Sequence, residues 1–185
     1  MRVAKWQGLG NVYLILEEAA LSVPLTSASV GILCDRHVGV GADGVLVRSE
    51  PTGAVSGAVA RMRILNPDGS EPEMCGNGIR MFARYLRSSG LDVEDEFVVE
   101  TLAGAIKPRL LADGAVRVDM GEAAFRSRNV DLPGREDVVG CSLEAEGERF
   151  EFTFVDVGNP HCIIMADDPS AVDVEIIGPR LERHD

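Results

Sequence analysis

The chain has 185 residues, 45% of them hydrophobic and 5% aromatic, enough to bury a mainly aliphatic core in one large or two small domains. Acidic residues outnumber basic ones by 30 to 18, and the net charge of -12 argues against a nucleic-acid partner, because phosphate binding needs a basic patch. The apolar run from Val12 to Leu16 is too short for a signal peptide or a membrane span, so a cytoplasmic protein with no membrane association is expected.

Segments rich in valine, isoleucine and leucine, and broken by glycine and proline, predict strands. In chain order these segments are Arg2–Gln7, Val12–Leu16, Val45–Arg48, Arg61–Asn66, Phe97–Thr101, Val116–Met120, Phe150–Val157 and Cys162–Met165. A short helix is expected at Thr26–Arg36, with Thr26 or Ser27 as its N-cap. The strands do not alternate with helices in a regular βαβ rhythm, which favours an α+β fold over a Rossmann fold.

The clearest helix is expected from about Gly76 to Arg87. Its apolar residues recur at i, i+3, i+4 and i+7, which predicts one buried stripe made of Ile79, Phe82, Ala83 and Leu86. Gly90 follows near the C′ position and ends the helix. A polar, turn-rich stretch separates the two groups of strands, so a domain boundary is expected near Met120, with halves 1–119 and 120–185.

The four cysteines are Cys34, Cys75, Cys141 and Cys162, and none forms a Cys-x-x-Cys pair. Free thiols are therefore expected, with neither a disulfide framework nor a zinc site or other metal centre. Cys34 falls in the first expected helix, Cys141 in a polar loop and Cys162 in an apolar strand. A structural role is the favoured interpretation for these three.

The stretch NPDGSEPEMCGNGIR, residues 66–80, places Cys75 at the start of the second helix. Its first four residues predict a type I turn. Gly76 and Gly78 leave first-turn N–H groups uncovered, and these groups, with roughly half a positive charge from the helix dipole, can bind an anion. A thiol there loses its proton more readily than an ordinary cysteine.

A carboxylate on those N–H groups would lie next to the sulfur of Cys75. This pairing suits the removal of a proton from the carbon beside a carboxylate. The pattern alone leaves four interpretations open: a base, a nucleophile, a redox thiol and a small buried side chain.

Five motifs, spread over the whole chain, resemble those of the diaminopimelate epimerase family. They are KWQGLGNVYLIL, DRHVGVGADGVLV, ILNPDGSEPEMCGNGIRMFARYL, VDVGNPHCIIM and IIGPRLERH. The resemblance implies two similar α+β halves, each a sheet wrapped around a central helix, with the active site between them. It also implies a cofactor-independent isomerase of lysine and peptidoglycan precursor synthesis, which interconverts LL- and meso-diaminopimelate with two cysteine bases and can form a homodimer.

By the same resemblance, Cys75 is one of the two bases and His161 lies beside the reacting centre. Gly76 and Asn77 bind the substrate carboxylate through the helix start. Three further asparagines hydrogen-bond the substrate, and these are Asn11, Asn66 and Asn159. Neutral amides suit a zwitterion, because each offers a donor and an acceptor. Without the resemblance, the three asparagines could instead be turn residues, and His161 could be an ordinary core or surface histidine.

The chain departs from the family pattern in two ways. Gly44 stands where some members carry a glutamine that contacts substrate, so that contact is not transferred. The Glu-Arg pair and the second glycine-flanked cysteine of the family have no counterpart, and Glu182-Arg183 is interpreted as surface. Adjacent His161-Cys162 cannot replace the second base, because neighbours on a strand point to opposite faces. We therefore expect a fragment whose second half is incomplete, and which alone is inactive or nearly so and poorly stable.

Two alternatives remain open at this point. The chain could be another isomerase of the same fold group, of the proline-racemase or phenazine-pathway kind, or a redox-sensing thiol protein that uses Cys75. The combination of NPDGS with CGNGIR favours diaminopimelate, and a redox sensor needs a resolving cysteine, which is not close in sequence. A phosphate site at GVGADG is disfavoured, since these glycines match neither a Walker nor a dinucleotide fingerprint.

Overall fold

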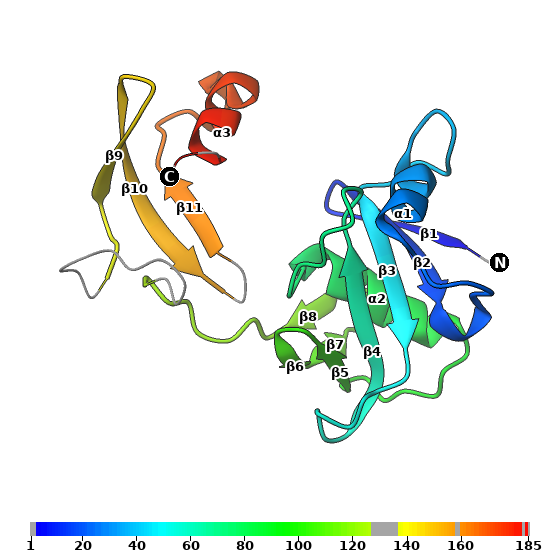
Figure 1. Cartoon of the computed structure of the whole chain (residues 1–185). Helices are drawn as coiled ribbons and strands as arrows, with labels where there is room; N and C mark the ends of the chain where they lie inside the picture. The colour runs from blue at the N-terminus through cyan, green and yellow to red at the C-terminus, as the bar shows by residue number, and fades with distance from the viewer. Residues whose placement is uncertain (1–2, 127–136, 158–159, 183, 185) are drawn as a thin grey trace. The chain divides into compact units, whose positions relative to one another are not determined.

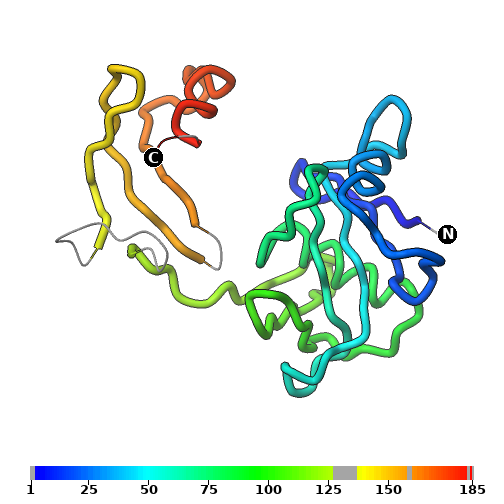
Figure 2. Tube along the Cα trace, viewed as in Figure 1, coloured from blue at the N-terminus to red at the C-terminus, as the bar shows by residue number. Residues whose placement is uncertain are grey.

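The computed structural model describes residues 3–126, 137–157, 160–182 and 184 (Figure 1). The chain divides into two compact units, Met1–Met120 and Gly121–Asp185. Figure 2 follows the path of the chain through each unit as a tube. The two units are described separately below.

A six-stranded sheet forms the frame of the first unit, and its strands lie side by side in chain order. The strands are β1 (Ala4–Gly8), β2 (Asn11–Glu17), β3 (Gly44–Ser49), β4 (Ala58–Leu65), β5 (Val98–Thr101) and β6 (Gly104–Ile106). Pairs β1–β2, β3–β4 and β5–β6 are antiparallel, whereas β2–β3 and β4–β5 are parallel. Each parallel pair needs a crossover, and a helix lies in each crossover.

Helix α2 (Gly76–Ser88) packs on one face of this sheet, against β1, β2 and β4. It also contacts a small two-stranded sheet, β7 (Pro108–Leu110) with β8 (Val116–Val118), so strands surround the helix on more than one side (Figure 1). The predicted stripe is confirmed, since Ile79, Phe82, Ala83 and Leu86 each have 0% exposure. Burial of this stripe stabilises the fold of the first unit.

Helix α1 (Ser27–Cys34) packs in a second cluster with alternate residues of β2 and β3. Leu14 and Leu16 belong to this cluster, whereas Tyr13 and Ile15 belong to the cluster around α2. Strand β2 is therefore buried on both faces, which explains its unbroken apolar sequence. Thr26, one of the two residues predicted as the N-cap of α1, is the N-cap and forms a capping box with Ser29.

The second unit holds a three-stranded antiparallel sheet in the order β11-β10-β9, together with α3 (Val174–Glu182). The strands are β9 (Cys141–Ala145), β10 (Glu148–Asp156) and β11 (Pro160–Ile164). Arg180 of α3 forms an ion pair with Glu146 of the β9–β10 turn at 3.1 Å. Four of the five residues of β11 are exposed. Apolar side chains are therefore exposed on this unit, including Ile163 and Met165.

The predicted strands and both predicted helices are confirmed, with ends shifted by a few residues. The sequence analysis missed β6, β7, β9, α3 and two 3-10 helices, Glu18–Ala20 and Pro169–Ala171. The prediction that Cys141 lies in a polar loop was wrong, because this residue is buried and begins β9. In the part of the chain that the structure describes, no helix is both long and apolar enough to cross a membrane.

Candidate active site

Cys75 is the N-cap residue of α2, and its thiol lies over the first turn of the helix. The sulfur accepts a hydrogen bond from the backbone N–H of Gly78 at 3.3 Å. Among the described hydrogen bonds, none uses the backbone N–H of Gly76 or of Asn77. Cys75, Gly76 and Asn77 are all half-buried, so a ligand can reach them. The helix start thus presents two free donors beside a thiol, an arrangement that can hold a carboxylate next to a base.

Gly78 is the point where α2 approaches the sheet most tightly near the thiol. A Cβ atom at this position would lie 3.3 Å from Leu46 Cδ2, 3.3 Å from Cys75 Cβ and 3.4 Å from Cys75 Sγ. Only hydrogen fits there without pushing the thiol or the strand. The glycine thus keeps the N–H of residue 78 within reach of the sulfur.

Tyr13 provides a second donor to the same sulfur. Its Oη donates to Cys75 Sγ at 3.5 Å, and its side chain comes from β2 on the opposite wall of the core. Burial raises the pKa of Tyr13 well above its ordinary value, and the hydrogen bond to Cys75 raises it further. The phenol therefore stays protonated and remains a donor at any pH at which a thiol ionises.

A chain of amide and carboxylate groups joins the helix start to β2 and β3. Asn77 Nδ2 donates to Asn11 Oδ1 at 2.8 Å, and Asn11 Nδ2 donates to Asp43 Oδ2 at 3.4 Å. Asp43 Oδ2 also accepts from the backbone N–H of Val12 at 2.8 Å, and its Oδ1 accepts from Arg36 at 3.1 Å. The Val12 N–H first, and then Asn11 and Arg36, hold the pKa of Asp43 below its usual range.

The structure thus brings together four of the predicted site residues, Asn11, Cys75, Gly76 and Asn77. Asn66 makes only local contacts among those described. Its side-chain Nδ2 donates to Ser70 Oγ at 2.9 Å. Its backbone carbonyl accepts from the N–H of Gly69 at 2.8 Å, and this bond closes the predicted turn. The amide of Asn66 is therefore engaged in its own turn and not in the group around Cys75.

The other predicted site residues fall in the second unit. His161 is exposed on β11, opposite Val155 of β10, and Asn159 lies outside the described residues. All four cysteines are free thiols, as expected: Cys34 and Cys141 are buried, and Cys162 is exposed. Within the described residues, no group of three or more His, Cys, Asp or Glu side chains could hold a metal ion.

Sequence reasoning missed Tyr13 and Asp43 as parts of the site. Tyr13 lies in an apolar strand segment, and this pattern indicates a core residue and nothing more. One signal was available, because Tyr13 lies two residues after Asn11 and alternate residues of a strand share a face. Asp43 stood within the quoted GADG motif, but no pattern in the sequence indicates that its carboxylate fixes Asn11.

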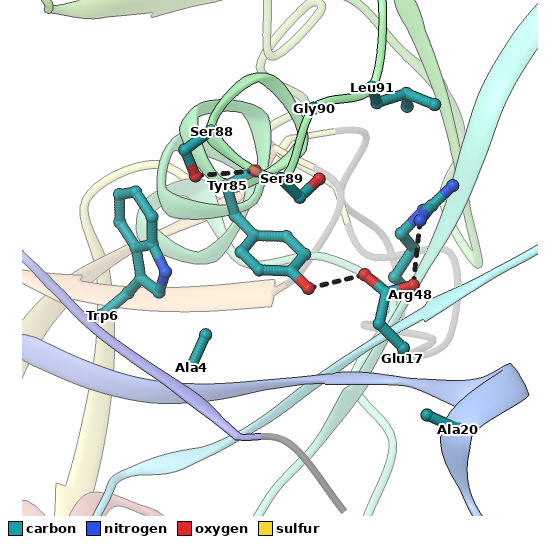
Figure 3. Close-up of a pocket in the computed structure, with 10 residues that line it drawn as sticks. All are labelled: Ala4, Trp6, Glu17, Ala20, Arg48, Tyr85, Ser88, Ser89, Gly90 and Leu91. Carbon is teal, nitrogen blue, oxygen red and sulfur yellow. Dashed lines mark hydrogen bonds and ion pairs between the residues drawn. The ribbon is translucent and has the colours of Figure 1, made fainter.

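A separate open cavity of ≈ 710 Å³ lies at the other end of α2 (Figure 3). Three of its polar side chains are joined: Tyr85 Oη donates to Glu17 Oε1 at 2.6 Å, and Arg48 pairs with Glu17 Oε2 at 2.9 Å. The buried Nε of Arg48 has no hydrogen-bond partner among the described residues. The ring of Trp6 meets that of Tyr85 edge to face at 6.3 Å between centroids (Figure 3). These contacts connect β1, β2 and β3 to the end of α2. The residues that line the cavity therefore have a structural role.

Comparison with known protein families gives a match over most of the chain. The family model described as diaminopimelate epimerase matches residues 3–126. A protein named diaminopimelate epimerase from Desulfitobacterium hafniense is 44% identical, over 100% of this chain and 66% of its own length. One of the same name from Nostoc punctiforme is 41% identical, over 97% of this chain and 66% of its own length. The chain therefore spans 66% of the length of these curated relatives.

Solved structures with low sequence identity share the fold. A hydroxyproline epimerase from Agrobacterium vitis has a TM-score of 0.67 at 14% identity, and covers 95% of this chain and 56% of its own. A probable proline racemase from Agrobacterium radiobacter gives 0.64 at 16% identity, with 95% and 52% covered. The expected α+β fold is thereby confirmed. With the family match over residues 3–126 and relatives above 40% identity, this chain belongs to the diaminopimelate epimerase family.

Proposed function

We propose that the first unit carries one half of the active site of a cofactor-independent isomerase that interconverts LL- and meso-diaminopimelate. The observation that carries this proposal is the half-buried thiol of Cys75 beside the free N–H groups of Gly76 and Asn77. The names of the relatives that match 97–100% of this chain support the choice of substrate.

In the proposed reaction, the thiolate of Cys75 removes the α-hydrogen of the substrate as a proton. The electron pair of the broken C–H bond moves into the adjacent carboxylate, where the N–H groups of Gly76 and Asn77 stabilise the added charge. A second acid on the opposite face then returns a proton to the α-carbon, which inverts the stereocentre. The net reaction needs no electron acceptor and no cofactor.

The roles of the remaining residues follow from the family resemblance and are part of the proposal. The amide of Asn11, already oriented by Asn77 and Asp43, contacts the substrate. For Asn66 one N–H of the amide is bound to Ser70, which leaves its second N–H and its oxygen for substrate. Asn159 contributes a further amide, and His161 lies beside the reacting centre.

Because the resemblance assigns only one base among these 185 residues, we propose that this chain alone is inactive or nearly so in epimerisation. Clear conversion of LL- into meso-diaminopimelate by the pure chain would contradict this point. A small-molecule substrate, a cytoplasmic location and a homodimer complete the proposal. Gel filtration with light scattering measures the oligomeric state.

The test of the function is protection of Cys75 against alkylation, followed by mass spectrometry of the peptide that contains it. We expect diaminopimelate to slow alkylation in proportion to its occupancy, and proline at the same concentration to have no effect. Protection by proline would favour a proline-type isomerase. Failure of both ligands, together with reversible sulfenic acid formation at Cys75 by peroxide, would favour the redox alternative.

A further inference from the structure

The sulfur of Cys75 receives hydrogen bonds from two different elements of the fold. One donor is the N–H of Gly78 in the first turn of α2, at 3.3 Å, and the other is Tyr13 Oη from β2, at 3.5 Å. The helix donor follows from the position of any N-cap residue. The phenol donor does not, because it depends on this particular side chain in β2.

The ring of Tyr13 is fixed by the residue across from it. Tyr13 pairs with Gly44 in the parallel β2–β3 ladder. A Cβ atom at position 44 would lie 2.7 Å from Tyr13 Cε1 and 2.9 Å from the carbonyl oxygen of Leu65. Contacts this short do not occur in proteins, so any side chain at position 44 would displace the ring.

This packing gives a reason for the glycine that departs from the family pattern. A glutamine at position 44 would compete with the Tyr13 ring for the same space. With Gly44, the ring is 6% exposed and its hydroxyl is directed at the thiol. Gly44 therefore leaves a space, and the ring of Tyr13 fills it.

The surroundings of the phenol favour the protonated form. Three acidic groups act on it from different elements, namely Cys75 at the start of α2, Asp43 before β3 and Cys34 at the end of α1. A negative charge on any of them opposes ionisation of the phenol. Tyr13 can thus give a hydrogen bond to a thiolate without losing its proton to it.

We propose that Tyr13 is a positioning residue for Cys75, whose hydroxyl donates to the thiolate and so sets the pH at which the sulfur becomes a base. When the thiol ionises, its proton goes to solvent, the sulfur keeps the electron pair, and the O–H bond of Tyr13 stays intact. The catalytic meaning of this role rests on the proposed function, but its effect on the thiol does not.

The test uses Tyr13→Phe in the full chain, a change that removes the hydroxyl and keeps the ring on Gly44. The rate of Cys75 alkylation by iodoacetamide is measured against pH, with the modified peptide quantified by mass spectrometry. We expect the midpoint of the profile to rise by about one pH unit, because hydrogen bonds to charged groups are stronger than neutral ones. An unchanged midpoint in a folded variant would overturn the proposal.

A matched control is available, because the chain has 2 tyrosines. Tyr85→Phe removes the other phenol, which binds Glu17, and should leave the profile of Cys75 unchanged. In this control background, replacing the remaining tyrosine by 3-fluorotyrosine gives a stronger donor at position 13. The midpoint should then move to lower pH, so this second variant tests the proposal even where Tyr13→Phe does not fold.

The outcome separates this inference from the proposed function. A shifted profile without protection by diaminopimelate keeps the role of Tyr13 and rejects the substrate. Protection by diaminopimelate with an unshifted profile keeps the function and rejects the role of Tyr13. A structural role alone for Tyr13 predicts lower stability with no change in the pH midpoint.

Discussion

Asn77 Nδ2 donates to Asn11 Oδ1 at 2.8 Å, and this bond joins the first turn of α2 to the first residue of β2. Both side chains are half-buried, so neither amide can recover full hydration when its partner is removed. The bond also fixes the amide of Asn11, which we propose contacts substrate. It therefore links the stability of the first unit to the orientation of the site.

The first prediction is that Asn11→Ala and Asn77→Ala are coupled. Each single change should lower the free energy of unfolding by about 0.5–1.5 kcal/mol, and the double change should cost less than the sum. Urea denaturation measures all three variants through the fluorescence of Trp6, the chain's single tryptophan, which packs on Tyr85 in this unit. Strict additivity would show that the bond does not form in solution.

The second prediction concerns pH and Asp43. Its folded-state pKa lies below the unfolded value of about 3.9, so the unfolded state binds a proton first as the pH falls. The stability that Asp43 contributes is therefore complete above about pH 5 and is lost on further acidification.

Asp43→Asn should consequently be less stable than the parent chain at pH 7, and the difference in unfolding free energy should shrink as the pH falls through the lowered pKa of Asp43. Asp92→Asn removes the same charge at an exposed carboxylate with no described hydrogen bond and is the matched control. A constant gap between Asp43→Asn and the parent from pH 7 to pH 3 would rule out this linkage.

A third prediction compares two leucines of the first unit. Leu86 of α2 is 0% exposed, whereas Leu102 in the β5–β6 turn is 48% exposed. Leu86→Ala should cost about 2–5 kcal/mol through lost burial and a cavity, and Leu102→Ala should change stability by less than about 0.5 kcal/mol. Denaturation followed by Trp6 fluorescence compares them directly, and equal losses would contradict the assigned core.

The fourth prediction tests the start of α1. Thr26→Ala removes the side-chain acceptor of the capping box and should cost about 1 kcal/mol. Thr26→Ser keeps an acceptor oxygen and should stay close to the parent chain. Because no described contact joins Thr26 to Cys75, both variants should keep the parent rate of Cys75 alkylation at a fixed pH. A slower rate in Thr26→Ala would reveal coupling between α1 and the site.

The sequence predicted those parts of the fold whose signal is local. The stripe of α2 follows from the spacing of Ile79, Phe82, Ala83 and Leu86, and its end from Gly90. Strands β6 and β7 have 3 residues each, too few for an alternation to be detected. Cys141 was misplaced for a similar reason, because a turn-rich neighbourhood concealed a short strand.

The site was predicted in part for the same reason. Cys75, Gly76 and Asn77 are contiguous, and the properties of a helix start follow from the sequence around them. The contact of Tyr13 with Cys75 depends on the packing of α2 against β2, and that of Asp43 with Asn11 depends on the pairing of β2 with β3. These partners are 62 and 32 positions apart in the chain. Separations of this kind cannot be inferred from a local pattern in one sequence.

The chain order of the six strands has a consequence for how the first unit folds. Each strand pairs with the strand made just before it, so every pairing partner is already present when a new strand leaves the ribosome. Short loops join the antiparallel pairs β1–β2 and β5–β6 and keep the entropic cost of their closure low, whereas the parallel pairs β2–β3 and β4–β5 close over longer crossovers. Helix α2 lies in the crossover between β4 and β5, and these two strands pair with each other. The thiol of Cys75 therefore lies on the longer of the two crossovers of this sheet, whose closure costs more entropy than that of a short hairpin loop.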